Sequence, residues 1–246
     1  MLSQTKVKYI QTLYQKKKRD AEGLFIAEGV KIINELLTAP HIAVKELFAV
    51  TEWVQANRAV QVPVTEVTEQ ELGRISSLTT PNQVLAIVHK PEPRAPEPLT
   101  GWAIALSGIQ DPGNLGTIIR TADWFGITEL ICSTDCADMY NSKVIQATMG
   151  SFARVNITYT QLEAYIPAQK NIPVYAAVLN GEPITGVAKA KKGILVIGNE
   201  SKGISEPVMN LCTHRVSIPR KGGAESLNAA VACGILLANL MESNNE

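Results

Sequence analysis

The chain of 246 residues contains no apolar run close to the roughly 20 residues that cross a membrane. The N-terminus also lacks the apolar core of a signal peptide, so we expect a cytoplasmic protein. Cysteines are scarce, and Cys132, Cys136, Cys212 and Cys233 lack the paired CxxC spacing of a zinc site. His214 stands close to Cys212, but two lone ligands do not form a site. We therefore expect no bound metal and interpret the cysteines as buried free thiols.

A net charge is also absent, because 23 Lys and Arg side chains balance 23 Asp and Glu side chains. The total charge therefore gives no indication of a polyanionic partner. The distribution of charge is different in the first 19 residues, which we call the basic arm. Their only charged side chains are basic: Lys6, Lys8, Lys16, Lys17, Lys18 and Arg19. A basic arm on a neutral protein is typical of nucleic-acid binding, although a solvated helix face gives the same pattern.

Two nucleotide-binding motifs are missing as well. Gly113 and Gly116 do not complete the GxGxxG motif of dinucleotide-binding folds. The stretch from Gly198 to Gly203 has the glycine spacing of a phosphate-binding loop, but Ile204 follows where that loop needs a lysine. Both a nicotinamide-dependent oxidoreductase and a Walker-type nucleotide hydrolase are therefore disfavoured. The sequence also has no internal repeat.

A proline-rich stretch divides the chain into two parts. Residues 91–100 contain four prolines, a density typical of a stiff and extended linker. Before it, residues 1–90 mix helical patterns with short β-type runs, which predicts a small α/β domain. The helices are expected at 1–18, 28–37 and 69–76, and the strands at 46–50 and 84–88.

After the linker, residues 101–246 alternate continuous apolar strands with helices. This alternation predicts a second α/β domain with a mostly parallel sheet covered on both faces. In such sheets ligands bind beyond the carboxyl ends of the strands. The strands are expected at 102–106, 129–132, 155–157, 174–179 and 194–197, and the helices at 115–125, 143–149, 207–212 and 227–241.

Three polar clusters follow predicted strands in this second domain. The first, DPGNLGTIIRTADWFG, begins with a Pro-Gly turn and places Asn114 where a helix N-cap belongs. Arg120 lies off the apolar stripe of the helix, so it is either a clamp for phosphate or substrate or a surface partner of Asp123. The second, GNESKG, places Glu200 directly after a buried strand, as a site residue or as a solvated turn glutamate.

The third cluster, IPRKGGAESLN, enters the last helix through a glycine-rich loop. Ser226 is the expected N-cap of that helix, with Leu227 and Asn228 in its first turn. A helix that begins after a glycine loop presents unpaired N–H groups, which favour an anion. An ordinary buried helix with an ordinary cap has the same local sequence.

Together the clusters resemble the three signature motifs of the SpoU (TrmH) family in the SPOUT methyltransferase superfamily. The resemblance covers roughly residues 100–246, and residues 7–29 are similar to the family's RNA substrate-binding domain. Two positions depart from the common pattern: Ser201 replaces a glycine and Arg220 replaces a methionine.

The resemblance implies a trefoil-knotted C-terminal domain and a ribosomal-protein-like N-terminal domain that holds RNA through residues including Lys16, Lys17, Lys18 and Arg19. It also implies a homodimer with its active site near the subunit interface. The expected cofactor is S-adenosylmethionine. Its expected binding residues are Leu179, Asn180, Gly181, Gly198, Asn199, Glu200, Ile218 and Leu227.

The implied reaction is methyl transfer to a ribose 2′-hydroxyl of structured RNA. Arg120 is the expected central catalytic residue, either as a base or as a group that holds phosphate and stabilises negative charge on the oxygen. Asn114, Glu200, Ser226 and Asn228 are expected to orient Arg120 and the ribose. The N-terminal module favours ribosomal over transfer RNA by analogy alone. The alternatives are a tRNA 2′-O-methyltransferase and a catalytically inactive RNA-binding assembly factor.

Overall fold

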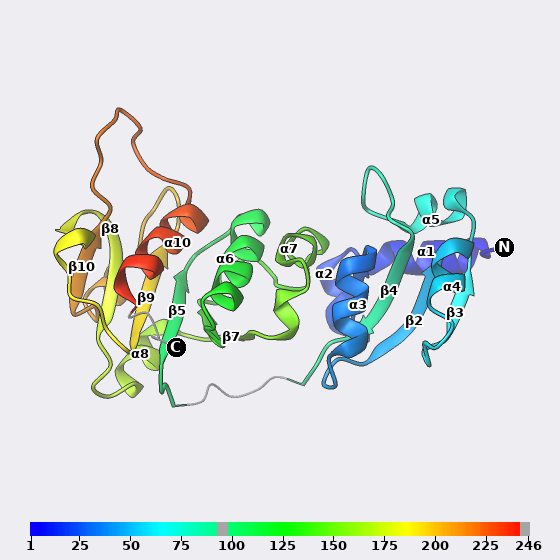
Figure 1. The fold of residues 1–246 in the computed structure, drawn as a ribbon, viewed down its shortest axis with the longest axis horizontal. Coiled ribbons are helices and arrows are strands. Elements are labelled where there is room, and N and C mark those ends of the chain that lie inside the picture. The colour runs from blue at the N-terminus through cyan, green and yellow to red at the C-terminus, as the bar shows by residue number, and fades with distance from the viewer. Residues whose placement is uncertain (93–97, 242–246) are drawn as a thin grey trace. The chain divides into compact units, whose positions relative to one another are not determined.

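The computed structural model describes residues 1–92 and 98–241, which form two compact units (Figure 1). The first unit comprises Met1–Glu92 and Asp138–Ala153, and the second contains the other described residues. Half of the expected linker 91–100, residues 93–97, lies outside the described residues. The expected division at the linker differs from the observed one, because Asp138–Ala153 belongs with the N-terminal part of the chain.

The first unit is built on a four-stranded sheet with strand order β1-β4-β2-β3. Strand β4 is antiparallel to both of its neighbours, and β2 pairs with β3 in parallel. The elements are α1 (Gln4–Thr12), α2 (Lys16–Glu22), β1 (Leu24–Glu28), α3 (Val30–Thr38), β2 (Val44–Ala49), α4 (Thr51–Ala56), β3 (Val64–Glu66), α5 (Glu69–Ile75), β4 (Val84–His89), α7 (Ser142–Thr148) and the 3₁₀ helix η1 (Ser151–Ala153).

Segment Asp138–Ala153 completes the apolar packing of the first unit. The ring of Phe25, on β1, lies 4.9 Å from that of Tyr140 and 5.8 Å from that of Phe152, between ring centroids. Gly150 has a φ of +98°, and a Cβ at this position would lie 2.7 Å from a side-chain atom of Glu35 on α3. Glycine therefore permits both the backbone conformation and the close approach to α3.

The second unit contains a six-stranded sheet in the order β10-β8-β9-β5-β6-β7, and every observed pairing in it is parallel. This confirms the predicted α/β class with a mostly parallel sheet. The elements are β5 (Trp102–Ser107), α6 (Pro112–Trp124), β6 (Glu129–Cys132), β7 (Asn156–Tyr159), α8 (Leu162–Ala168), β8 (Val174–Pro183), η2 (Ile184–Gly186), β9 (Gly193–Gly198), α9 (Glu206–Met209), β10 (His214–Ser217) and α10 (Ala229–Leu240).

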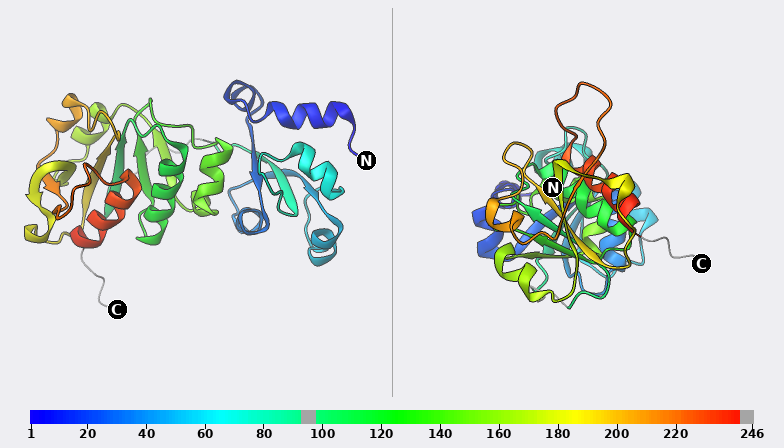
Figure 2. Two further views of the ribbon diagram at one scale, coloured as in Figure 1. Left: turned by 90° about the horizontal axis from the view of Figure 1, so that it is seen from above. Right: turned by 90° about the vertical axis from the view of Figure 1, so that its left-hand side faces the viewer.

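Helices cover both faces of this sheet. Helices α8 and α9 pack on one face, where Leu162, Ile166 and Val208 join a buried cluster with Ala105 and Val196 of the central strands. Helices α6 and α10 contact each other and lie side by side in Figure 1 and in the left view of Figure 2. The chain runs outward from β5 to β6 and β7 and then fills the other side with β8 and β9. The direction of winding therefore switches between β5 and β9, the position where such sheets form a binding crevice.

Several expected boundaries change in the structure. The basic N-terminal helix is two helices, because the chain turns at 13–15 between α1 and α2. Residues 24–28, read from sequence as loop and helix start, form the buried strand β1. Helix α8 also appears without having been expected. Among the helices of the described residues, none combines the length and apolar content that a membrane span requires.

Candidate functional site

The carboxyl ends of β5, β8, β9 and β10 meet at one edge of the parallel sheet. Loops from three of these strands, together with the start of α10, enclose a cavity of about 770 Å³ within the second unit. Of the residues expected to bind the cofactor, seven line this cavity: Leu179, Asn180, Gly198, Asn199, Glu200, Ile218 and Leu227. Loops that are far apart in the sequence therefore converge here because all strands of the sheet point the same way.

An irregularity in β8 supplies one wall. The register of β8 and β10 moves from Arg215 opposite Ala176 to Val216 opposite Glu182, so residues 177–181 loop out of the ladder. Leu179 in this loop is 72% exposed, although it is a large apolar side chain. An exposed leucine on the wall of a cavity offers apolar contact to a ligand.

Gly198 and Gly181 are both required by close backbone contacts, but only Gly198 lines the cavity. A Cβ on Gly198 would lie 2.4 Å from the carbonyl carbon of Gly203, which shows how tightly the following loop folds back. A Cβ on Gly181 would lie 2.6 Å from the carbonyl oxygen of Arg215. Gly181 lets β8 and β10 approach each other, and its expected role in cofactor binding stays a prediction.

A bridge of side-chain amides joins the three polar clusters. The Asn114 amide nitrogen donates to the Glu200 carboxylate, and the Asn228 amide nitrogen donates to Asn114 Oδ1 at 2.7 Å. Each residue comes from a different loop or helix start, after β5, β9 and β10. We call these three side chains the amide bridge. They are partly or fully exposed to solvent, and therefore accessible to a ligand.

The amide bridge forms because other residues cap the two helices. Asp111, and not Asn114, is the N-cap of α6, and its carboxylate accepts from the Asn114 backbone N–H at 2.8 Å. The Asn114 side chain is therefore free to reach across. At α10 the N-cap is Asn228, whose Oδ1 accepts from Ala230 and Val231, so the expected cap at Ser226 is wrong.

Ser226 and Arg220 lie in the exposed loop 219–228 that extends from the second unit (Figure 1). Ser226 lines the cavity. The wall also carries four cations that the sequence did not single out as cofactor residues: Lys202, Arg215, Arg220 and Lys221. Lys221 and Arg220 could have been noticed as the basic residues of the glycine-rich loop.

Arg120 stands on the exposed side of α6. Asp123, the partner of Arg120 in the alternative interpretation, instead pairs with Arg154, whose Nη2 lies 2.8 Å from Asp123 Oδ2. In the described residues no hydrogen bond or ion pair holds the Arg120 guanidinium, and Arg120 does not line the cavity. Its donors are consequently available to a ligand or to another chain.

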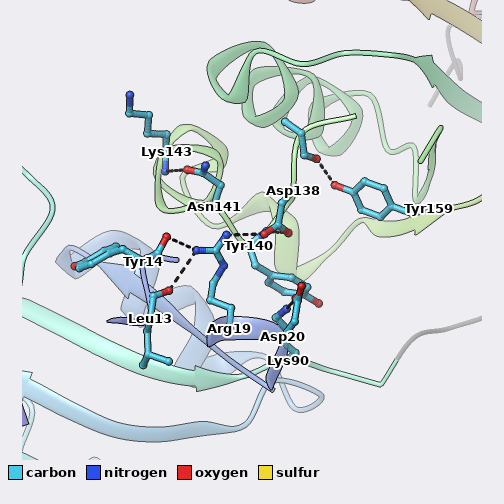
Figure 3. A network of polar contacts seen from close by, with 11 residues as sticks. Leu13, Tyr14, Arg19, Asp20, Lys90, Asp138, Tyr140, Asn141, Lys143 and Tyr159 are labelled. Carbon is cyan, nitrogen blue, oxygen red and sulfur yellow. Dashed lines mark hydrogen bonds and ion pairs between the residues drawn. The ribbon is translucent and has the colours of Figure 1, made fainter. Parts of the chain in front are cut away.

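The basic arm of the first unit divides into exposed lysines and a buried arginine. Lys16 and Lys17 are exposed, and Lys18 pairs with Glu22 at 2.5 Å. Arg19 is 3% exposed, and its guanidinium donates to the carbonyls of Leu13 and Tyr14 and to Asp138 Oδ2 at 2.6 Å (Figure 3). The prediction that Arg19 contacts RNA is therefore corrected, since its charge is used inside the first unit.

In the part of the chain that the structure describes, no three His, Cys, Asp or Glu side chains group so as to hold a metal ion.

Comparisons with known proteins agree with the geometry of both units. Residues 101–238 match the model of the SpoU rRNA methylase family, and residues 4–86 match an MRM3-like substrate binding domain. The chain is 30% identical over 239 residues, 96% of its length and 95% of the relative's, to the 23S rRNA (guanosine(2553)-2′-O)-methyltransferase RlmP of Bacillus subtilis.

Two solved structures are similar to this chain over almost its whole length. A protein of the TrmH family from Porphyromonas gingivalis is 37% identical, with a TM-score of 0.85 and coverage of 98% of both chains. The AdoMet-bound rRNA methyltransferase of Sinorhizobium meliloti is 33% identical, with a TM-score of 0.86 and coverage of 98% of this chain and 96% of the other.

Proposed function

Since the chain belongs to the SpoU rRNA methylase family, we propose that it transfers a methyl group from S-adenosylmethionine to a ribose 2′-hydroxyl of ribosomal RNA. The observation that carries the proposal is the amide bridge of Asn114, Glu200 and Asn228 beside the cavity. The RNA substrate follows from the related 23S rRNA enzyme and from the match of residues 4–86 to a substrate binding domain. A ribosomal RNA substrate also favours a cytoplasmic location.

The cavity fits S-adenosylmethionine in size and chemistry. Its volume of about 770 Å³ lies in the range of small-molecule sites, and its wall combines apolar side chains with backbone polar groups. Leu179, Ile218 and Leu227 would contact apolar parts of the cofactor, and the backbone at Gly198 would lie against it. When bound, the cofactor supplies an electrophilic methyl group on a sulfonium.

The residues of this chain would position the attacking oxygen. A transfer of this kind depends strongly on alignment, so groups that fix the ribose contribute much of the rate. The amide bridge holds Glu200 at the mouth of the cavity and leaves amide and carboxylate groups available for a ribose. Arg120, which stays protonated, would hold a neighbouring phosphate and stabilise negative charge on the oxygen.

We further propose that the protein is a homodimer and that Arg120 lies at its interface. Trp124, one helical turn after Arg120, is 86% exposed, and Val231 on the adjacent α10 is 51% exposed. Exposed large apolar side chains on neighbouring helices are typical of an interaction surface. A partner that covers this face would also cover Arg120. The trefoil knot that the family resemblance implies is part of the same proposal.

The direct test of activity is transfer of labelled methyl groups into total RNA from cells that lack the protein, followed by mapping of the nucleotide. Methylation of one ribose in ribosomal RNA is expected. Methylation of transfer RNA would shift the substrate to the first alternative. Binding of RNA without any transfer would support the inactive assembly factor and contradict the proposed enzyme.

The dimer proposal is tested by mixing two inactive variants, Arg120→Ala and Glu200→Ala, under conditions of subunit exchange. If Arg120 acts with the cavity of its partner, each heterodimer contains one intact site and activity returns. If every site lies within one chain, the mixture stays inactive. Light scattering of the wild type that shows a monomer at micromolar concentration would contradict the dimer.

A further inference from the structure

We propose that Cys132 and Cys136 form a reversible disulfide when the protein meets a peroxide, and that this bond weakens cofactor binding in the cavity. Formation of the bond is independent of the proposed function, whereas the ligand that reports on it rests on that function. Both cysteines belong to the second unit, and neither lines the cavity or joins the amide bridge.

The backbone brings the two thiols together. Cys132 is the last residue of β6, and Cys136 closes the turn that follows, with its N–H donating to the Ser133 carbonyl at 3.1 Å. Cys136 Sγ lies 3.4 Å from the carbonyl oxygen of Leu106, which is the strand neighbour of Cys132. The same oxygen accepts from the Ser133 N–H at 2.9 Å, one residue beyond Cys132. Both thiols therefore lie around the Leu106 carbonyl, four residues apart in the chain, and the Cys132 thiol acts on the pKa of Cys136 as a hydrogen-bond donor.

The pair has the division of roles that disulfide formation needs. The Cys132 thiol, and after it the Ser133 hydroxyl, lower the pKa of the Cys136 thiol to about 7 by hydrogen bonding, against the effect of burial. Burial raises the pKa of Cys132 well above its usual value. Cys136 is half-buried, so a small oxidant can reach it, and its thiolate is the nucleophile.

The remaining cysteines lack these features. Burial raises the pKa of Cys212 to about 11 and that of Cys233 to about 12. Cys212 is half-buried like Cys136, but its Sγ donates to the carbonyl of Val208, four residues earlier in the chain. Cys212 is consequently a matched control for exposure without thiolate character.

The chemistry balances with hydrogen peroxide as the oxidant. The Cys136 thiolate attacks one peroxide oxygen, which breaks the O–O bond, gives a sulfenic acid and releases hydroxide that is protonated to water. The Cys132 thiol then attacks the sulfenic sulfur and loses its proton, and a second water leaves as the S–S bond forms. Two thiols and one peroxide thus yield one disulfide and two waters, and an external thiol reverses the oxidation.

A short chain of contacts connects this turn to the cavity. The Ser133 hydroxyl, which lies 3.4 Å from Cys136 Sγ, accepts from the Gly108 N–H at 2.8 Å. The Gly108 carbonyl in turn accepts from the Asn199 amide at 2.7 Å. Asn199 Oδ1 accepts from the N–H groups of Ser201 and Lys202, so it holds the loop that contains Glu200.

Disulfide formation must disturb this chain because it shortens a hydrogen-bond separation to a covalent S–S bond of about 2.05 Å. Cys136 has to move toward Cys132, and the turn 133–136 moves with it. This movement should also shift Gly108, because Gly108 packs closely against the turn. Gly108 has a φ of +72°, and a Cβ at this position would lie 3.1 Å from Asp135 Oδ2. The oxidised protein should therefore hold Asn199 less firmly.

The experiment compares reduced and peroxide-treated protein. The intact mass should fall by about 2 Da, and peptide mapping should join the peptides of Cys132 and Cys136. Calorimetric titration with S-adenosylmethionine should show an affinity at least about fivefold weaker after oxidation, restored by dithiothreitol. Amide hydrogen exchange at Ser201 and Lys202 should be faster in the oxidised protein, a readout that needs no cofactor.

Cys136→Ser should abolish both the mass change and the loss of affinity, while Cys212→Ser should leave both as in the wild type. Absence of the Cys132–Cys136 linkage overturns the proposal. A disulfide that changes neither affinity nor exchange at Ser201 and Lys202 overturns the connection to the cavity. Reduced protein that fails to bind S-adenosylmethionine contradicts the proposed function, and the mass and exchange measurements still decide the disulfide.

Discussion

The two units each contain a polar network that joins distant parts of the chain, and the two networks differ in exposure. In the first unit, Arg19 reaches Asp138 across 119 positions, and its side chain is 3% exposed. In the second unit, Asn114 reaches Asn228 across 114 positions, at the surface beside a cavity. In the buried network the guanidinium of Arg19 donates to acceptors of the chain itself, so we call it closed. The exposed network leaves polar groups available for a substrate, so we call it open.

A second network in the first unit is also closed. Glu28 is 5% exposed and accepts from the hydroxyls of Tyr14 and Ser77 and from the Ser77 backbone N–H. Burial, followed by the charge of Glu28, raises the pKa of Tyr14. A buried carboxylate with several donors is satisfied within the fold, so it indicates stability more than chemistry. The difference between closed and open networks can be tested by substitution.

The largest effect is expected at the open network. Arg120→Ala should lower methyl transfer by about a thousandfold, because it removes the only charged group proposed to stabilise the attacking oxygen. Binding of S-adenosylmethionine, measured by calorimetry, should stay unchanged. Arg154→Ala is the control, since this arginine pairs with Asp123 on the same helix α6. Near-normal turnover of Arg120→Ala would show that the assignment is wrong.

Substitution in the closed network around Arg19 should lower the stability of the protein. Arg19→Met leaves the Asp138 carboxylate, 14% exposed, without its cation, and should reduce the free energy of unfolding by about 3–5 kcal/mol. Denaturant unfolding measures the change. The double variant Arg19→Met with Asp138→Leu should recover most of it, because no unpaired charge remains. Equal stability of Arg19→Met and wild type would refute the structural role.

Within the amide bridge, Asn114→Ala should reduce the turnover number by about a hundredfold, because Glu200 and Asn228 lose the group that aligns them. Protein stability should change little, since Asp111 caps α6 and Asn114 does not. Steady-state kinetics alongside thermal unfolding separates these outcomes. A large drop in the unfolding temperature together with intact kinetics would reverse the distinction between the two networks.

The smallest effect is expected from the exposed lysines of α2. Lys16→Gln with Lys17→Gln should weaken RNA binding and reduce the slope of log affinity against log salt by about one for each lysine. Lys170→Gln, an exposed lysine of the second unit, serves as the control. Salt-dependent binding to ribosomal RNA measures the slope. An unchanged slope would remove α2 from the RNA-binding surface.

Some of these features follow from local sequence. Apolar strands separated by helices determine a parallel sheet, and such a sheet brings the loops after its strands to one edge. The three polar clusters were therefore expected at one edge of the sheet, and the resemblance to the SpoU family then implied that Asn114, Glu200 and Asn228 belong to one site. The sequence also predicts a close backbone approach at Gly198, because this glycine stands at the end of a buried strand.

Other features depend on partners that local patterns do not reveal. A basic run looks the same whether its arginine faces solvent or a carboxylate 119 positions later, so only the tertiary structure placed Arg19 inside. Likewise, the caps expected from local sequence were Asn114 and Ser226, whereas Asp111 and Asn228 cap the two helices in the structure. Local sequence determined the strands, loops and residue types of this protein, because periodicity and turn chemistry act over a few residues. Tertiary structure decided which polar groups are buried and paired, because burial is set by contacts between segments distant in the chain.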